Sequence, residues 1–597
     1  MENRKTEAGR FMERMAAVLL AGTVFAGSVL TGCGMADGAW SKSSSAGNMT
    51  ADMAAPAETT EAAASEEAWD AGYGMTGAVQ DSEAGAGETL RYPGEDVERN
   101  TEPVQRNAEE YSQWEEKGFS PVYQEPLSTF SADVDTASYS NLRRLIMGGY
   151  AVENLPEGAV RIEEIINYFS YGDLADPEDG EPFGVTTQIM PCPWNRETQL
   201  LRIGLKTQDV DYGDSPDSNL VFLLDVSGSM YAPDKLPLLQ ESFALLAENL
   251  TEKDRVSIVT YAGEDTIVLE GVPGSETKKI CQALYALEAG GGTHGSRGIE
   301  TAYRLAEEYF IEGGNNRVIL ATDGDLNVGL TTEDELEDLI TEKKESGVFL
   351  SVLGFGAGNI KDNKMETLAD KGNGNYAYID SLREANKVLV EEMSATLLTV
   401  CKDVKFQVEF NPAVVEEYRL IGYDNRRLAA EDFDDDTKDA GEIGAGHCVT
   451  ALYEIVTTEP VNGRGKTQKD LKYAEFHEGN EKDIAGDGGK EEPVGDGNNH
   501  KEYEWLTVSI RYKEPDGNES MLLEYPVDFT AYTEDADDDF LFAAAAAEFG
   551  LAAMDSGYRA DASFAHVLEV LEEMDLEDEY KKEFLELVDM LRKNSSK

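Results

Sequence analysis

The feature that most constrains this chain is a short apolar run that ends abruptly in polar residues. Every residue from Val221 to Leu224 is apolar, which is typical of a strand buried on both faces. Three oxygen-bearing side chains follow at alternate positions, namely Asp225, Ser227 and Ser229. Open sheets of parallel strands bind ligands at this end of a strand, and such oxygens suit a small hard cation. The same residue types also favour turns and helix caps, so this stretch alone leaves both interpretations open.

Two later segments supply residues of the same kind. Gly290–Gly292 come directly before Thr293, at the start of a helical pattern. Arg317–Thr322 is predicted to be a second buried strand, and it ends at Asp323. A D-x-S-x-S stretch, then a Thr after glycines, then an Asp after a later strand resembles the metal-ion-dependent adhesion site of von Willebrand factor type A (VWA) domains.

The resemblance implies a role for each residue. Ser227, Ser229 and Thr293 would contact a divalent cation directly, while Asp225 and Asp323 would hold it mostly through water. The position left open would accept a carboxylate from a partner protein. Mg²⁺ is the expected cation, with Mn²⁺ and Ca²⁺ as alternatives.

The central domain is expected to span residues 218–398 with an α/β fold. Strand and helix patterns alternate there, which predicts a mostly parallel, Rossmann-like sheet with helices on both faces. The metal residues would then converge from separate loops on one edge of that sheet. The predicted helices are Lys235–Asn249, Thr277–Leu287, Gly298–Phe310, Thr332–Lys344, Lys361–Asp370 and Ser381–Leu397.

The flanking segments have different patterns. Residues 107–217 predict an α+β region, and residues 399–591 predict a β-rich domain closed by amphipathic helices. A polar insert at 457–500 is expected to be disordered. Asp133 and Asp135 are similar to the nucleophile motif of haloacid-dehalogenase phosphatases, but Ala137 stands where that motif has Thr or Val. We therefore expect Asp135 or Thr136 to cap a helix instead.

The amino terminus has the pattern of a targeting segment. Basic residues precede an apolar run from Ala16 to Leu30, and the sequence Leu30-Thr31-Gly32-Cys33 resembles the bacterial lipobox. The resemblance implies a signal peptide at 1–32, cleavage before Cys33 and lipidation of its sulfur. Residues 33–106 are rich in small and polar residues and predict a disordered tether. The expected location is the bacterial cell envelope, outside the cytoplasm.

Charge and cysteine content narrow the choice of partners. The chain has 51 Lys and Arg against 117 Asp and Glu, a formal net charge of −66. This balance argues against nucleic acid and against an anionic membrane surface as the main partner. The remaining cysteines are scattered without a CxxC motif, so neither a zinc site nor a disulfide framework is predicted. These four cysteines are Cys192, Cys281, Cys401 and Cys448.

Five segments taken together are similar to one bacterial family of VWA lipoproteins, the YfbK-like family. That family has an N-terminal conserved region, a VWA domain and a C-terminal domain of unknown function. The resemblance covers roughly residues 107–591. The segments that carry it are Phe130–Tyr139, Arg161–Phe169, Cys192–Asn195, Asp225–Ser229 and Phe542–Gly550.

These observations favour a binding protein over an enzyme. The leading hypothesis is a surface lipoprotein, held in the membrane through Cys33, whose metal site binds a protein ligand that presents an acidic residue. One alternative is an envelope scaffold in which the metal is structural. Another is a hydrolase, but the sequence has no GxSxG, Walker A or HExxH motif. Partnership with an AAA+ ATPase, known for other bacterial VWA proteins, conflicts with the lipobox.

Overall fold

A computed structural model describes residues 108–595 of this chain, apart from short gaps and one long one. Cys33, the predicted signal peptide and the tether therefore lie outside the described residues. Thr293 and most of the predicted insert at 457–500 also lie outside them. The gaps are residues 179, 211–215, 293–294, 325–332, 345, 459–503, 516 and 518, and the side chains at 295–296 and 333–336 are likewise not described.

The central domain is built on a six-stranded sheet with the order β10-β9-β8-β5-β6-β7. Neighbouring strands are parallel except at one edge, where β7 runs antiparallel to β6. The strands are β5 (Ser218–Asp225), β6 (Arg255–Tyr261), β7 (Asp265–Pro273), β8 (Asn315–Thr322), β9 (Phe349–Phe355) and β10 (Tyr376–Ile379).

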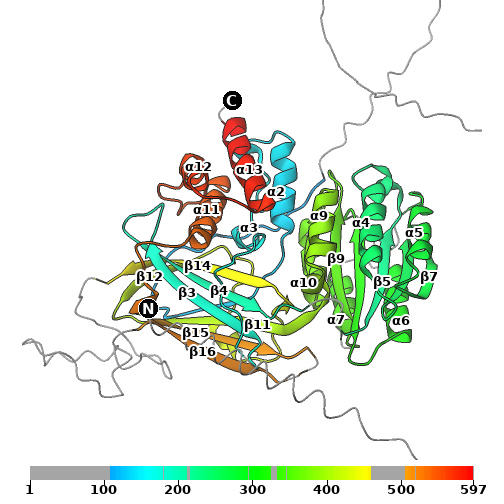
Figure 1. The fold of residues 1–597 in the computed structure, drawn as a ribbon, viewed down its shortest axis with the longest axis horizontal. Coiled ribbons are helices and arrows are strands. Elements are labelled where there is room, and N and C mark those ends of the chain that lie inside the picture. Colours follow the sequence, from blue (N-terminus) through cyan, green and yellow to red (C-terminus); the bar gives the residue numbers. More distant parts are fainter. Residues whose placement is uncertain are drawn as a thin grey trace, which may run out of the picture. The chain divides into compact units, whose positions relative to one another are not determined.

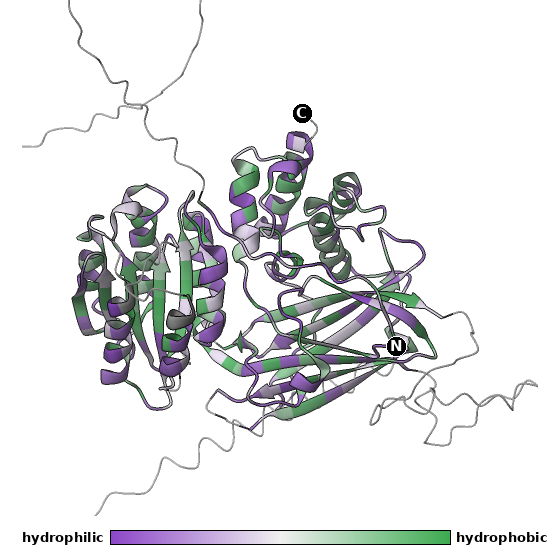
Figure 2. Ribbon diagram, turned by 180° about the vertical axis from the view of Figure 1, so that it is seen from behind, coloured by the Kyte–Doolittle hydropathy of each residue, from purple (hydrophilic) through white to green (hydrophobic). Residues whose placement is uncertain are grey.

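Helices cover both faces of this sheet (Figure 1). Leu220, Phe222 and Leu224 of β5 join one hydrophobic cluster, while Val221 and Leu223 join another on the opposite face. Figure 2 shows the strands between the helices as largely hydrophobic. The predicted mostly parallel α/β fold is confirmed. The first face is covered by α4 (Leu236–Asn249), α5 (Thr277–Tyr285), α9 (Leu382–Asn386), a π-helical turn (Lys387–Glu391) and α10 (Met393–Leu397), and the second by α6 (Gly295–Glu308), α7 (Glu333–Lys344) and α8 (Asp362–Lys371).

The two flanking regions share their sheets. One sheet has the order β1-β12-β14-β4-β3, and the other has the order β13-β11-β15-β16 with β2 paired to β11. Strands that precede the central domain thus pair with strands that follow it, a connection that periodicity within one segment cannot reveal. The strands are β1 (Ser120–Pro121), β2 (Leu127–Ser131), β3 (Phe183–Pro191), β4 (Gln199–Thr207), β11 (Thr399–Phe410), β12 (Val415–Ile421), β13 (Gly441–Gly444), β14 (Cys448–Thr457), β15 (Glu504–Lys513) and β16 (Met521–Asp528).

Helices from both flanking regions pack around one further core. Phe169, Phe542 and Phe584 meet in it with ring centroids 4.9–5.7 Å apart. The helices are α2 (Ala137–Met147), α3 (Ile162–Asn167), α11 (Asp538–Ala553), α12 (Phe564–Glu573) and α13 (Glu579–Ser595). Among the described residues, 3₁₀ turns lie at Val152–Asn154, η3 (Gly228–Tyr231), Ala430–Phe433 and Phe529–Ala531.

The predicted N-cap position of helix α2 is confirmed at Thr136, one of the two predicted residues. The predicted side-chain cap does not form, because Thr136 makes no side-chain hydrogen bond to the helix. Asp135 instead accepts a hydrogen bond from the Tyr376 amide at 2.7 Å and one from Arg426 at 3.1 Å. Long-range partners from the central domain and from the segment after β12 therefore take the carboxylate that local sequence assigned to the helix end.

Within residues 108–595, no described helix combines the length and the apolar character that crossing a membrane requires.

The four cysteines of this part of the chain, Cys192, Cys281, Cys401 and Cys448, are all free thiols. Cys192 is buried, and its burial raises the pKa of its thiol to about 12.

Candidate metal centre

The candidate metal centre begins at the carboxyl end of strand β5. This strand lies between β6 and β8, parallel to both, and all 8 of its residues are buried. Its continuous apolar run fits that place, since both faces of the strand are covered by helices. Asp225 ends the strand with 0% of its surface exposed. A carboxylate thus stands at the edge where α/β sheets bind ligands.

The turn after β5 brings two hydroxyls to the same place. The Ser227 amide donates to Oδ1 of Asp225 at 2.8 Å, which folds the chain back toward the strand end. The Oγ atoms of Ser227 and Ser229 lie 2.9 Å apart, at the start of the 3₁₀ turn η3. Ser227 is buried and Ser229 is exposed, so the oxygens lead from the strand end to the protein surface.

The neighbouring strand β8 brings the second carboxylate. Asp323 follows β8 directly and is 1% exposed. Oγ1 of Thr322 donates to Oδ2 of Asp225 at 3.0 Å, and the Tyr261 hydroxyl donates to the same oxygen at 3.3 Å. These bonds fix the orientation of Asp225 from both neighbouring strands. Thr322 and Tyr261 are positioning residues that the sequence analysis did not identify.

Burial dominates the electrostatics of Asp225. Desolvation raises the pKa of its carboxyl to about 6, although hydrogen bonds from the Ser227 amide and hydroxyl lower it. The negative charge of Asp323 raises it further. Two buried carboxylates at one strand edge are costly unless a cation or hydrogen-bond donors offset their charge.

Part of that charge is balanced by a lysine of the chain itself. Nζ of Lys235 lies 2.8 Å from Oδ2 of Asp323, with the two side chains 5% and 1% exposed. The lysine stem passes over Gly356, where φ is +75° and a Cβ atom would lie 2.2 Å from Cγ of Lys235. The sequence predicts Lys235 only as the first residue of a helix. A lysine at a helix start does not reveal which carboxylate it will reach.

The glycine segment before Thr293 lies against the turn that follows β5. The Gly290 amide donates to the Val226 carbonyl at 2.8 Å, and the Gly228 amide donates to the Gly291 carbonyl at 3.2 Å. Gly291 has a φ of +85°, a conformation that favours glycine. The segment that leads to Thr293 is thus held beside the serines, while Thr293 itself lies outside the described residues.

The donor set fits a hard divalent cation. Asp225, Ser227, Ser229 and Asp323 are brought together and offer only oxygen. Neighbouring ligands of an octahedral Mg²⁺ ion are about 3.0 Å apart when each lies about 2.1 Å from the metal. The 2.9 Å between the two serine hydroxyls matches that spacing. Such an ion would supply a positive charge and a coordination position for an anionic group.

A mostly parallel sheet with this oxygen set at its carboxyl edge defines a VWA-domain protein. The family model "von Willebrand factor type A domain" matches residues 219–392. VWA domains commonly mediate metal-dependent protein interactions and typically bind a divalent cation. The model "von Willebrand factor" matches residues 105–202, and "Uncharacterized protein YfbK, C-terminal" matches residues 395–593.

The chain belongs to the YfbK family. It is 41% identical to the uncharacterized protein YfbK of Escherichia coli (strain K12) over 488 residues, which cover 80% of each chain. Human inter-alpha-trypsin inhibitor heavy chain H3 is 28% identical over 192 residues, 30% of this chain and 21% of that protein. The solved von Willebrand factor type A structure from Catenulispora acidiphila is 17% identical with a TM-score of 0.39, and the match covers 72% of this chain and 92% of that one.

Proposed function

We propose that this protein is an envelope lipoprotein that binds a protein ligand through a divalent cation held at the candidate metal centre. The observation that carries the proposal is the convergence of Asp225, Ser227, Ser229 and Asp323 at one sheet edge, with Ser229 exposed. Mg²⁺ is the proposed ion. An Asp or Glu side chain of the ligand, or its terminal carboxylate, would complete a shell of about six oxygens.

The site favours binding over catalysis. Ser227 and Ser229 contact each other, and the carboxylate of Asp225 is occupied by donors from Ser227, Thr322 and Tyr261. The Ser227 hydroxyl also hydrogen-bonds Asp225, but that carboxylate is a proposed metal ligand, which makes it a poor general base for a serine nucleophile. We therefore propose that the protein is not an enzyme.

Metal-dependent capture tests the binding function. The full chain is immobilised and exposed to an envelope extract, with Mg²⁺ or with EDTA. A ligand should be retained with Mg²⁺, released by EDTA and absent from the double variant Asp225→Ala with Ser227→Ala. The control variant, Glu252→Ala with Ser275→Ala, loses an exposed carboxylate and an exposed hydroxyl and should behave as wild type. Retention that is insensitive both to EDTA and to the double variant would contradict the proposal.

The membrane anchor is tested separately. The lipobox-like sequence that ends at Cys33 supports attachment through a diacylglyceryl group on its sulfur. Wild-type protein should fractionate with membranes and incorporate labelled fatty acid, and Cys33→Ser should do neither. A Cys33→Ser protein that stays in the membrane fraction would count against this part of the proposal.

A further inference from the structure

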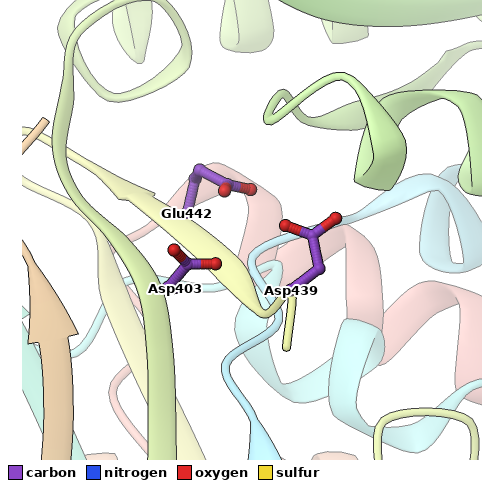
Figure 3. A group of neighbouring side chains, drawn as sticks. All are labelled: Asp403, Asp439 and Glu442. Atoms are coloured by element: carbon purple, nitrogen blue, oxygen red, sulfur yellow. The ribbon is translucent and has the colours of Figure 1, made fainter. Parts of the chain in front are cut away.

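A second group of carboxylates lies away from the VWA site, in the sheet formed by the flanking regions (Figure 3). Asp403 lies on β11, Asp439 lies just before β13, and Glu442 lies on β13. Strands β11 and β13 pair antiparallel, with register shifts between Thr399 and Cys401 and between Cys401 and Val404. The second shift inserts Asp403 at the place where Glu442 lies on the opposite strand.

The three carboxylates are close enough to share one ion. One oxygen from each lies within 4.8 Å of the others. Some point therefore lies within about 2.8 Å of all three oxygens, since that radius is 4.8 Å divided by √3. Ca²⁺ binds oxygen at about 2.3–2.6 Å, whereas Mg²⁺ requires about 2.0–2.1 Å. Three carboxylates held in place by other contacts do not form the near-ideal octahedron that Mg²⁺ demands, so they suit Ca²⁺, whose shell is flexible.

Glu442 supplies an independent sign that a ligand belongs here. Its side chain is 5% exposed, and within the described part of the chain its Oε1 atom has no hydrogen-bond partner. A buried, unpartnered carboxylate oxygen is costly, so native structures rarely keep one without a cation, a water molecule or a proton. Burial and the charges of Asp439 and Asp403 raise the pKa of Glu442 well above its usual range.

Two neighbouring lysines form ion pairs with the other two carboxylates, Asp403 and Asp439. Lys513 contacts Asp403 at 2.7 Å, and Lys344 contacts both oxygens of Asp439 at 2.9 and 2.8 Å. Arg317 interacts with the charge of Glu442. Its two terminal nitrogens, however, donate to the hydroxyls of Ser351 and Thr399, at 2.6 and 3.1 Å.

Water can reach this group on the side of Asp439. A cavity of about 160 Å³ is lined by Asp439, Ala440 and Gly441, together with residues of the segment after β12. This volume holds several water molecules, which Ca²⁺ needs because it takes six to eight oxygen ligands.

We propose that Asp403, Asp439 and Glu442 form a second cation site, separate from the VWA site, that binds Ca²⁺. The carboxylates supply three ligands and water from the cavity completes the shell. Each carboxylate oxygen has two lone pairs, so an oxygen that accepts from a lysine can still coordinate an ion. The lysines weaken binding by repulsion, which places the site among low-affinity calcium sites rather than tight ones.

Calorimetric titration of Ca²⁺ into the full chain tests this site. The titration uses the background variant Asp225→Ala with Ser227→Ala, which removes the VWA site. Ca²⁺ binding measured in this background therefore reports on the second site alone, whether or not the proposed function of the VWA site is right. One Ca²⁺ should bind per chain in this background. Adding Glu442→Gln should weaken binding at least tenfold, whereas the control Glu524→Gln, an exposed carboxylate on β16, should leave it unchanged. No Ca²⁺ binding in the background, or binding unchanged by Glu442→Gln, would overturn the proposal.

A second variant is expected to increase the Ca²⁺ affinity, a result that loss of folding cannot produce. Lys344→Met removes the ammonium group that competes for Asp439, so Ca²⁺ should bind several-fold tighter. A merely structural cluster predicts weaker binding or none in this variant, and that result would overturn the proposal. Circular dichroism of each variant in EDTA establishes that it is folded, and Asp439→Asn replaces Glu442→Gln if the latter is not.

Discussion

Lys235 and Asp323 form a buried ion pair inside the candidate metal centre, with Nζ 2.8 Å from Oδ2. The chain thus carries its own cation beside the place proposed for a divalent one. The pair neutralises a carboxylate that would otherwise be buried beside Asp225, and it reduces the negative charge that attracts the metal. Stability of the metal-free protein and affinity for the metal therefore depend on the same lysine.

Replacing Lys235 by Met should separate these two effects. Without metal, the variant leaves Asp323 buried without its ammonium partner, which costs about 3–5 kcal/mol. A bound divalent cation offsets that cost, so Mg²⁺ should raise the unfolding midpoint of Lys235→Met more than that of wild type. Urea unfolding with Mg²⁺ and with EDTA measures the difference. Lys279→Met, at an exposed position of α5, is the control. An equal or smaller response to Mg²⁺ in Lys235→Met would show that the lysine only positions Asp323.

Removal of metal should destabilise the wild-type protein only modestly. A site that exchanges its ion with solvent contributes RT ln(1 + [L]/Kd), about 2.7 kcal/mol at a free metal concentration of 100 Kd. Thermal unfolding with and without EDTA measures this contribution, and Asp225→Ala should show no EDTA effect at that site. Complete unfolding on chelation would favour the alternative of a scaffold with a structural metal.

The contact between α2 and the VWA domain should be a major source of stability. Arg143 is 3% exposed at its side chain and pairs with Asp380 at 2.6 Å, with Glu384 at 2.7 Å and with Glu583 at 3.0 Å. Arg143→Ala leaves these carboxylates without their shared cation and should cost about 3–5 kcal/mol in urea unfolding. The control is Arg304→Ala, whose partner Glu308 is exposed, and it should cost less than about 1 kcal/mol. Similar losses in both variants would contradict this prediction.

Glu163 should make stability fall as pH rises. Burial raises the pKa of this carboxyl from 4.5 to about 7 in the folded protein. Between these values the folded chain keeps a proton that the unfolded chain has lost, so a rise in pH lowers the free energy of unfolding. Glu163→Gln should remove up to about 3 kcal/mol of that dependence. Urea unfolding at pH 5 and pH 7 tests this, with exposed Glu153→Gln as the control. An identical pH dependence in wild type and Glu163→Gln would exclude Glu163 as the group responsible.

The central fold could be predicted from the sequence because its signals are local. The run from Val221 to Leu224 is apolar without alternation, and only a strand covered on both faces suits it. Alternating strand and helix patterns then leave few arrangements other than a mostly parallel sheet. Asp225, Ser227 and Ser229 adjoin one strand, so their proximity follows from the chain itself. The proximity of Asp323 follows from parallel strands that end at the same edge.

The flanking regions show the opposite case. Periodicity indicates that β2 and β4 are strands, yet their partners β11 and β14 lie beyond the whole VWA domain. Pairing at such separation depends on how the whole chain packs, and no local pattern encodes that. The same reason explains the error at Asp135, whose partners Tyr376 and Arg426 are distant in sequence.

By itself, the sequence determined the α/β class of the central domain, the oxygen-rich edge of its sheet and membership of the VWA proteins. The first two follow from residue patterns along one strand and between consecutive elements, and the third follows from the resemblance of the D-x-S-x-S, Thr and Asp order to that family. Only the tertiary structure decided that Lys235 neutralises Asp323, that the flanking segments share two sheets, and that Asp403, Asp439 and Glu442 meet. Charges act through space over a few ångströms, so their pairing is fixed only when packing brings distant segments together.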